Sequence, residues 1–249
     1  MSRFPKSGLN FLLRAACLAA VTIPAAQAGS FSVSPVRIFM EMRERATGVT
    51  IINEGDTDLV MQAELFEWKQ KPDGSDDLQP TQDLVLAPPI LRLPKGARQV
   101  VRLANLRAPS PGEQLSYRLI VREVPEALAP TQPGVQIQVA LAFSLPVFIT
   151  PPGAQRALAC TATRTSPTAL RATCENRGQA YAQPASMVLA TPSGNTLATS
   201  EIKGGYILPN VTRSFEIGNQ GSRIPGGPLK LQVTQDDGSK QVFDVQLPE

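Results

Sequence analysis

The stretch VQIQVALAFSLPVFI, residues 135–149, decides the fold of this chain. Its odd-numbered residues, from Val135 to Ile149, are all apolar, whereas its even-numbered residues begin with Gln136 and Gln138. Alternation with a period of two predicts a β-strand that has one apolar face. An ordinary strand has about five or six residues. This one would extend over roughly 45–50 Å at about 3.3 Å per residue.

Two interpretations of this stretch are open. It is either a long or bent core strand that is buried along its whole odd face, or a strand of which one half, around residues 137–143, lies at an edge. In the second case the exposed half lends its side chains to another protein. The alternation alone favours the core strand, because most apolar residues in such a pattern are buried.

The first 28 residues have the features of a signal peptide. Arg3 and Lys6 form a basic start, an apolar run follows at 18–21, and Ala26-Gln27-Ala28 is a cleavage site made of small residues. We therefore expect cleavage after Ala28 and a soluble exported protein. Later apolar runs are all shorter than the roughly 18–20 residues that a spanning helix needs, so we expect no membrane insertion.

Removal of this segment changes the charge of the chain. The remaining 221 residues carry 21 basic and 21 acidic side chains, so their net charge gives no argument for binding nucleic acid or anionic lipid. Their number suits one large or two small domains. The whole chain has 23 prolines and 18 glycines, with many short apolar runs between turn residues. This composition predicts an all-β protein.

The runs divide into two groups on either side of a Pro151-Pro152-Gly153 linker. The first group predicts an immunoglobulin-like sandwich at 29–151, with a polar loop at 71–80 and a break or edge at Pro35. The second group is shorter and predicts a smaller β-sandwich at 152–249. The strands expected in the first group are 31–39, 48–53, 59–69, 84–93, 97–103, 115–124 and 135–149.

The sequence gives little support to an enzyme. It has no histidine, which removes Ser-His, Cys-His and His-metal arrangements. The carboxylate pairs Asp76-Asp77 and Asp236-Asp237 lie in turn contexts beside glycine. We expect no catalytic residue, no metal and no cofactor. After signal cleavage Cys160 and Cys174 remain, and we expect them to form a structural disulfide in an oxidising compartment.

Five stretches of the first group resemble the PapD-like periplasmic pilus chaperones of chaperone–usher pathways. They follow one another in the order found in that family, and the ending SLPVF is most similar to its archaic branch. The stretches are SPVRIFM (34–40), TIINEG (50–55), APPILRLPKGARQVVRL (87–103), GEQLSYRLIVREVP (112–125) and VQIQVALAFSLPVFITP (135–151).

The resemblance implies two immunoglobulin-like domains in a boomerang arrangement with a cleft between them. Pilus subunits of this pathway lack their last strand, and a chaperone strand fills the open groove with alternate apolar side chains. On this chain the donor side chains would be Ile137, Val139, Leu141 and Phe143. The later part of the same strand, residues 145–149, would remain in the core of the chaperone.

In the family, two basic residues in the cleft hold the C-terminal carboxylate of the subunit. The first corresponds to Arg37. The second, a lysine of the last strand, falls on Pro146 here, so another residue must supply the charge. We expect Arg118 to do so, with Arg122 and Arg102 as the other candidates. Glu113 matches an acidic residue of an interdomain ion-pair network, but its basic partner near Thr150 is absent.

The sequence therefore predicts a non-enzymatic periplasmic chaperone that binds fimbrial (pilus) subunits and passes them to an outer-membrane usher. When free, it is expected to be able to associate with itself through the donor strand. The alternative is a secreted β-sandwich adhesin or carbohydrate-binding module. A sugar binder should carry clustered exposed aromatics, but Trp68 is the only tryptophan and Tyr117, Tyr181 and Tyr206 are scattered along the sequence.

Overall fold

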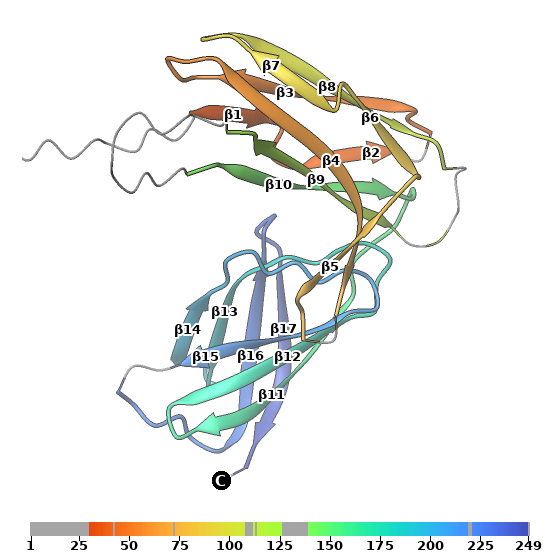
Figure 1. The fold of residues 1–249 in the computed structure, drawn as a ribbon. Helices are drawn as coiled ribbons and strands as arrows, with labels where there is room; N and C mark the ends of the chain where they lie inside the picture. The colour runs from red at the N-terminus through yellow and green to blue at the C-terminus, as the bar shows by residue number, and fades with distance from the viewer. Residues whose placement is uncertain are drawn as a thin grey trace, which may run out of the picture.

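The computed structural model describes residues 30–41, 43–71, 73–107, 112, 114–125, 139–218 and 221–248. Every regular element in these residues is a β-strand, and the strands form four sheets that pack as two sandwiches (Figure 1). The two sandwiches meet at an angle, as the boomerang arrangement requires. The all-β, two-sandwich fold class is therefore confirmed. Nothing in the described part of the chain is a helix long and apolar enough to cross a membrane.

The first sandwich is built from strands β1 to β10. One sheet has the order β1-β3-β8-β6, and the other has the order β2-β10-β9-β4-β5, with β7 pairing with β4. In the first sheet the strands are β1 Phe31–Ser34, β3 Ala46–Asn53, β8 Arg98–Asn105 and β6 Leu84–Ala87. In the second they are β2 Ile38–Glu41, β10 Ala142–Thr150, β9 Leu115–Glu123, β4 Leu59–Gln70, β5 Asp76–Pro80 and β7 Ile90–Leu93.

Alternation along these strands produces the core of the first sandwich. Val49 and Val101 from one sheet face Leu119 and Val147 from the other, and all four are fully buried. The predicted break at Pro35 is present, because β1 pairs with β3 in the first sheet whereas β2 pairs with β10 in the second. Pro35 thus lies where the chain passes from one sheet to the other.

The polar segment 71–80 differs from its prediction as a loop. Residues 76–80 form β5, which pairs with β4 and makes a hairpin that reaches toward the second sandwich (Figure 1). None of the five residues of β5 is buried, so the segment lacks the apolar alternation that marks a core strand. Its backbone pairing with β4 holds it in place.

The second sandwich contains β11 to β17. Its sheets have the orders β11-β12-β15 and β14-β13-β16-β17, and its core is separate from that of the first sandwich. In the first sheet the strands are β11 Leu158–Ser166, β12 Ala169–Asn176 and β15 Thr212–Gly218. In the second they are β14 Thr196–Glu201, β13 Pro184–Ala190, β16 Gly227–Gln235 and β17 Lys240–Leu247.

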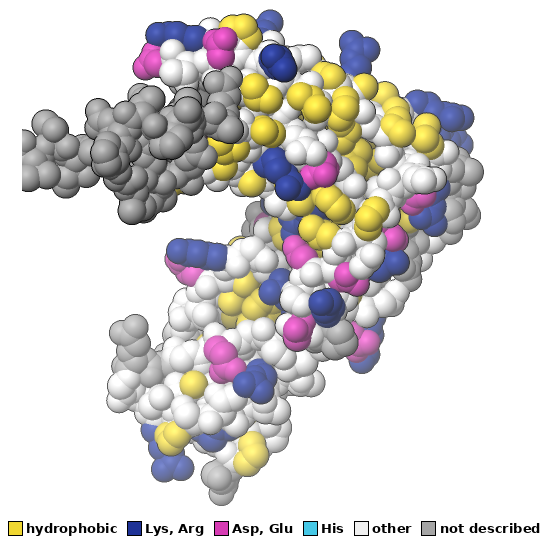
Figure 2. Space-filling view, viewed as in Figure 1, with side chains coloured by type: hydrophobic (Ala, Val, Ile, Leu, Met, Phe, Trp, Pro, Cys, Tyr) yellow, Lys and Arg dark blue, Asp and Glu magenta, His cyan; other side chains and the backbone are white. Residues whose placement is uncertain are grey.

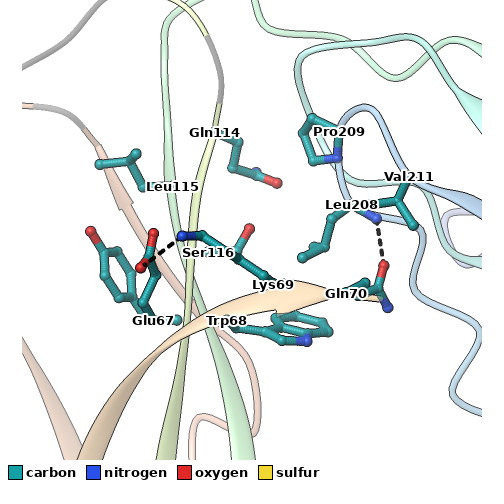
Figure 3. Close-up of a pocket in the computed structure, with 11 residues that line it drawn as sticks. Glu67, Trp68, Lys69, Gln70, Gln114, Leu115, Ser116, Leu208, Pro209 and Val211 are labelled. Carbon is teal, nitrogen blue, oxygen red and sulfur yellow. Dashed lines mark hydrogen bonds and ion pairs between the residues drawn. The ribbon is translucent and has the colours of Figure 1, made fainter. Parts of the chain in front are cut away.

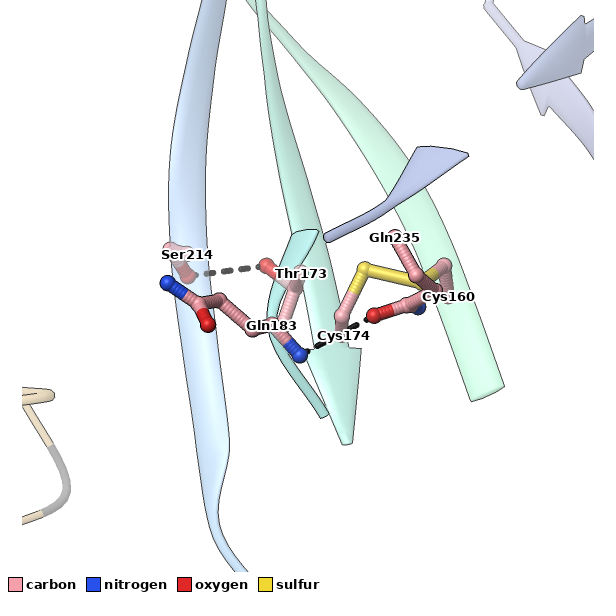
Figure 4. The surroundings of a disulfide bond; sticks show 6 residues. All are labelled: Cys160, Thr173, Cys174, Gln183, Ser214 and Gln235. Carbon is pink, nitrogen blue, oxygen red and sulfur yellow. Dashed lines mark hydrogen bonds between the residues drawn. A yellow bond between two sulfur atoms is a disulfide. The ribbon is translucent and has the colours of Figure 1, made fainter. Parts of the chain in front are cut away.

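The predicted disulfide is confirmed. Cys160 on β11 and Cys174 on β12 lie directly opposite each other in the antiparallel register, with their Cα atoms 4.1 Å apart and their sulfurs 2.06 Å apart (Figure 4). Both cysteines are buried in the core of the second sandwich. The bond therefore links two neighbouring strands from inside and has a structural position.

Candidate functional site

The predicted donor stretch changes from exposed to buried along its length. Val139 and Leu141, which precede β10, are 47% and 37% exposed, whereas Leu145, Val147 and Ile149 are at most 3% exposed. Neither of the two interpretations of the sequence pattern as a uniform strand therefore describes the whole stretch: its second half is core and residues 139–141 are on the surface.

Phe143 lies at the transition between these two parts. Its side chain is half-buried and packs edge to face against Phe31, with the ring centroids 4.9 Å apart. It also packs against the core of the first sandwich. Ile137, the fourth predicted donor residue, lies outside the described residues.

The first half of β10 has an open edge. On one side, residues 142–149 pair with β9 in antiparallel register. On the other side, β2 pairs in parallel only with residues 147–150. Within the described part of the chain, no strand pairs with residues 142–146 on that second side. Unpaired backbone groups at a sheet edge are a template for another strand.

The two sandwiches meet around an aromatic cluster, which we call the junction cluster: Trp68, Phe148, Tyr181 and Tyr206. Phe148 stacks on Tyr181 with centroids 4.2 Å apart, and Trp68 contacts Tyr206 edge to face at 5.4 Å. Trp68 and Phe148 come from the first sandwich, are 2% and 0% exposed, and form a buried cluster with Leu208 of the second. The tyrosines that are scattered in the sequence thus converge, but they pack against buried rings and form no exposed aromatic platform.

Arg37 and Arg118 reach this cluster from the two strands that flank β10. Ile38 lies opposite Val147 and Arg118 lies opposite Pro146, so the two arginines are placed on either side of Pro146. Because Ile38 and Leu119 point into the core, the alternation directs both arginines to the outer face of the sheet. Each guanidinium carbon is 5.7 Å from the centroid of the Tyr206 ring.

The Arg37 guanidinium bonds to the second sandwich. Its Nη1 donates to Oδ2 of Asp236 over 2.5 Å and to the Tyr181 hydroxyl over 3.1 Å. Burial alone would lower the pKa of Arg37, but the bond to Asp236 and the neighbouring tyrosines raise it above its usual value. The group therefore carries a positive charge at any physiological pH.

Arg118 is the more deeply buried of the two. Its side chain is 11% exposed, its Cζ lies 3.6 Å from the centroid of the Trp68 ring, and its Nη2 donates to Oδ2 of Asp76 over 3.1 Å. Burial lowers its pKa, and the charge of Asp76 partly offsets that effect. Nε of Arg118 is buried without a hydrogen-bond partner, which leaves donor capacity at the junction.

The other two predicted anchor residues lie elsewhere. Arg122 is four residues further along β9, opposite Ala142, and pairs with Glu64. Arg102 is exposed on β8, in the other sheet of the first sandwich. The structure thus brings Arg37 and Arg118 together and leaves Arg122 and Arg102 apart from them.

Neutral amide side chains connect the two sandwiches near the junction cluster. Gln70 donates through Nε2 to the Tyr206 carbonyl and accepts from the Leu208 backbone N–H, both over 3.0 Å. Gln114 donates to the Thr150 hydroxyl and accepts from the Tyr181 N–H. Thr150, where a basic partner was expected, thus bonds to a glutamine, and Glu113 lies outside the described residues.

Residues of both sandwiches line a pocket beside these contacts. It has a volume of about 320 Å³, and Gln70, Gln114 and Leu208 contribute to its wall (Figure 3). The space-filling view shows that the molecule is hollowed on one side between the sandwiches (Figure 2). Among the described residues, no three cysteine or carboxylate side chains come close enough to hold a metal ion.

Sequence reasoning missed four residues of the junction: Tyr181, Tyr206, Asp236 and Asp76. The two aspartates were interpreted as solvated turn residues, and each instead bonds to an arginine. Asp76 also accepts from the Trp68 indole over 2.8 Å. Their positions in the sequence give no signal for these contacts, because every one of them joins segments that only the folded chain brings together.

Comparison with known proteins agrees with this architecture. No curated protein matches the sequence. The chain is similar in structure to the chaperone CsuC of Acinetobacter baumannii, solved in a pre-assembly complex with the tip adhesion subunit CsuE, with 21% identity, a TM-score of 0.62, and coverage of 89% of this chain and 100% of that one.

Two further solved structures give the same result. One is the E. coli chaperone DraB, with 19% identity, a TM-score of 0.57, and coverage of 89% and 98%. The other is a complex of the Salmonella enterica SafA pilin with the SafB chaperone, with 16% identity, a TM-score of 0.57, and coverage of 90% and 99%. At these identities the likeness is one of fold.

A match in sequence identifies the family. Residues 30–155, just over half of the 249 residues, match the pili and flagellar-assembly chaperone family through its PapD N-terminal domain. This segment contains all of the first sandwich, including β10 and both junction arginines. The chain belongs to the pili and flagellar-assembly chaperones.

Proposed function

We propose that this chain is a periplasmic chaperone that binds pilus subunits, completes their fold with its own strand, and delivers them to an outer-membrane usher. The observation that carries the proposal is the course of one strand. Val139 and Leu141 are exposed at the start of a segment that is fully buried four residues later. Large apolar side chains at an open sheet edge invite association with another chain.

The chemistry of the edge fits an incomplete sandwich as the partner. The unpaired backbone of residues 142–146 can bond to a partner strand, and alternate side chains can fill a groove in the partner core. Full burial of one such side chain contributes about 1.5–3 kcal/mol. The donor residues Ile137, Val139, Leu141 and Phe143 are thus suited to cover apolar surface that would otherwise aggregate.

Arg37 and Arg118 supply the second part of the proposed site. A subunit strand that pairs with β10 would end near Pro146, between the two guanidinium groups. Charge-assisted hydrogen bonds to a terminal carboxylate contribute about 1.5–3 kcal/mol each. Arg118 then takes the role of the family lysine that Pro146 replaces.

Three features support the cellular context of this proposal. CsuC and SafB, which share the fold, were solved in complexes with an adhesion subunit and a pilin. The first 28 residues have the pattern of a cleaved signal peptide, which would bring the chain to the periplasm. The ending SLPVF is similar to the archaic branch, and self-association through the free donor segment is the expected resting state.

Copurification with a coexpressed pilus subunit tests the proposal. Arg37→Ala and Arg118→Ala should each remain folded, by their melting curves, and lose most of the bound subunit. Arg102→Ala is the matched control, because it removes the same side chain from the opposite sheet and should retain the subunit. Retention by both junction variants at the control level would refute the anchor.

A further inference from the structure

The Arg37 guanidinium already holds a carboxylate in the free protein. Asp236, the first residue after β16, presents Oδ2 to Nη1 of Arg37 at 2.5 Å. The two side chains are only 30% and 18% exposed. Asp236 belongs to the second sandwich and Arg37 to the first, so the pair closes the junction at the position proposed for a subunit carboxylate.

The charges at the junction are balanced. Arg37 pairs with Asp236, and Arg118 pairs with Asp76. With both pairs intact, a third carboxylate would meet two cations and two anions, and it would gain little net attraction. Entry of an anion therefore requires that one of the two internal carboxylates leave.

The surroundings of the two aspartates decide which one leaves. Asp76 is held twice, because its carboxylate also accepts from the Trp68 indole over 2.8 Å. In the part of the chain that the structure describes, Arg37 is the only side chain that bonds to the Asp236 carboxylate. Asp236 lies in the turn between β16 and β17, where its carboxylate can rotate into water while its backbone N–H stays bonded to the Gln183 carbonyl.

We infer that Asp236 is an internal substitute for the carboxylate of the subunit, and that the subunit displaces it from Arg37 on binding. This inference rests on the proposed function of Arg37 as an anchor. In the free chaperone the pair leaves the junction neutral, so small anions gain little from binding there. Only a ligand that also adds strand pairing along β10 gains enough free energy to replace Asp236, which makes the pair a device for specificity.

A peptide with the sequence of the C-terminal strand of the subunit used in the copurification is the probe. It is titrated in two forms, one with a free C-terminal carboxylate and one with a C-terminal amide. Asp236→Asn should tighten binding of the acid form about tenfold and leave binding of the amide form unchanged. Asp237→Asn is the matched control, because it removes the same charge one residue away from a side chain that pairs with Arg156. It should change either affinity by less than about twofold.

The outcomes separate this inference from the proposed function. If the wild type prefers the acid form, Arg37→Ala removes that preference and Asp236→Asn binds no more tightly than wild type, the anchor stands and the displacement of Asp236 is refuted. Weaker binding by Asp236→Asn would mean that Asp236 positions Arg37, which also refutes it. If the wild type binds both forms equally and Arg37→Ala changes nothing, the anchor itself fails and the inference fails with it.

Discussion

A charge introduced at two positions of one strand should have opposite effects on stability and binding. Val147 is fully buried, with Ile38 and Tyr117 as its neighbours on the flanking strands. Val147→Glu loses about 1.5–3 kcal/mol of apolar burial, and the buried carboxylate costs several kcal/mol more. Together these losses approach the net stability of an ordinary domain, about 5–15 kcal/mol.

Leu141 is six residues earlier and 37% exposed. Leu141→Glu should therefore change the free energy of unfolding by no more than about 0.5 kcal/mol. Its new carboxylate would face Glu123, whose backbone N–H donates to the Leu141 carbonyl over 2.9 Å. Leu141→Lys is the control for that repulsion, because it introduces a charge of the opposite sign at the same place. Either charge would be unpaired in the apolar groove of a subunit and should abolish binding.

Melting curves measured beside a subunit pull-down test this prediction. Val147→Glu should lower the Tm by about 20 °C or remove the cooperative transition of the first sandwich. Both Leu141 variants should melt within a few degrees of the wild type and fail to retain the subunit. If Leu141→Glu and Leu141→Lys melt as early as Val147→Glu, residue 141 belongs to the core and the donor-strand proposal loses its physical basis.

The remaining predictions concern processing and the junction. Intact mass spectrometry of protein from the periplasm should show a chain that begins at Gly29 and contains one disulfide, and two free thiols or an uncleaved leader would contradict this. Replacement of both Cys160 and Cys174 by serine should cost about 3 kcal/mol in urea unfolding, and an unchanged midpoint would show that the bond adds no stability. Gln70→Leu removes two bonds between the sandwiches. It should cost about 2 kcal/mol, and no change would mean that the aromatic cluster alone joins them.

Most strands of the first sandwich could be predicted from the sequence because one face of each is buried. β4 and β9, for example, alternate over most of their length and so carry their own signal. β5 carries none, because its residues are polar and its position depends on backbone pairing with β4. The prediction of a loop at 71–80 failed for that reason.

The donor stretch could be predicted only as an apolar strand. The alternation continues unchanged from Val139 through Ile149, although the first two odd positions are exposed and the last three are buried. What differs is the presence of β2, which pairs with the second half alone. The pattern of one strand contains no information about where its neighbour ends.

The anchor could be predicted in part. The family resemblance pointed to Arg37, and the register of β9 against β10 then placed Arg118 opposite Pro146. The contacts that hold these arginines come from Asp236 and Tyr206, which belong to the other sandwich. Such contacts depend on how two domains meet, which local sequence patterns do not encode.

Hydrogen exchange of the chaperone, alone and in complex with a pilus subunit, tests the central claim most directly. Residues 139–144 precede or begin β10, and their outer edge is unpaired by any described strand. Their amides should gain strong protection in the complex, whereas residues 147–149, already buried between β2 and β9, should change little. Unchanged exchange at 139–144 in a stable complex would show that the subunit binds elsewhere and would contradict the donor-strand account.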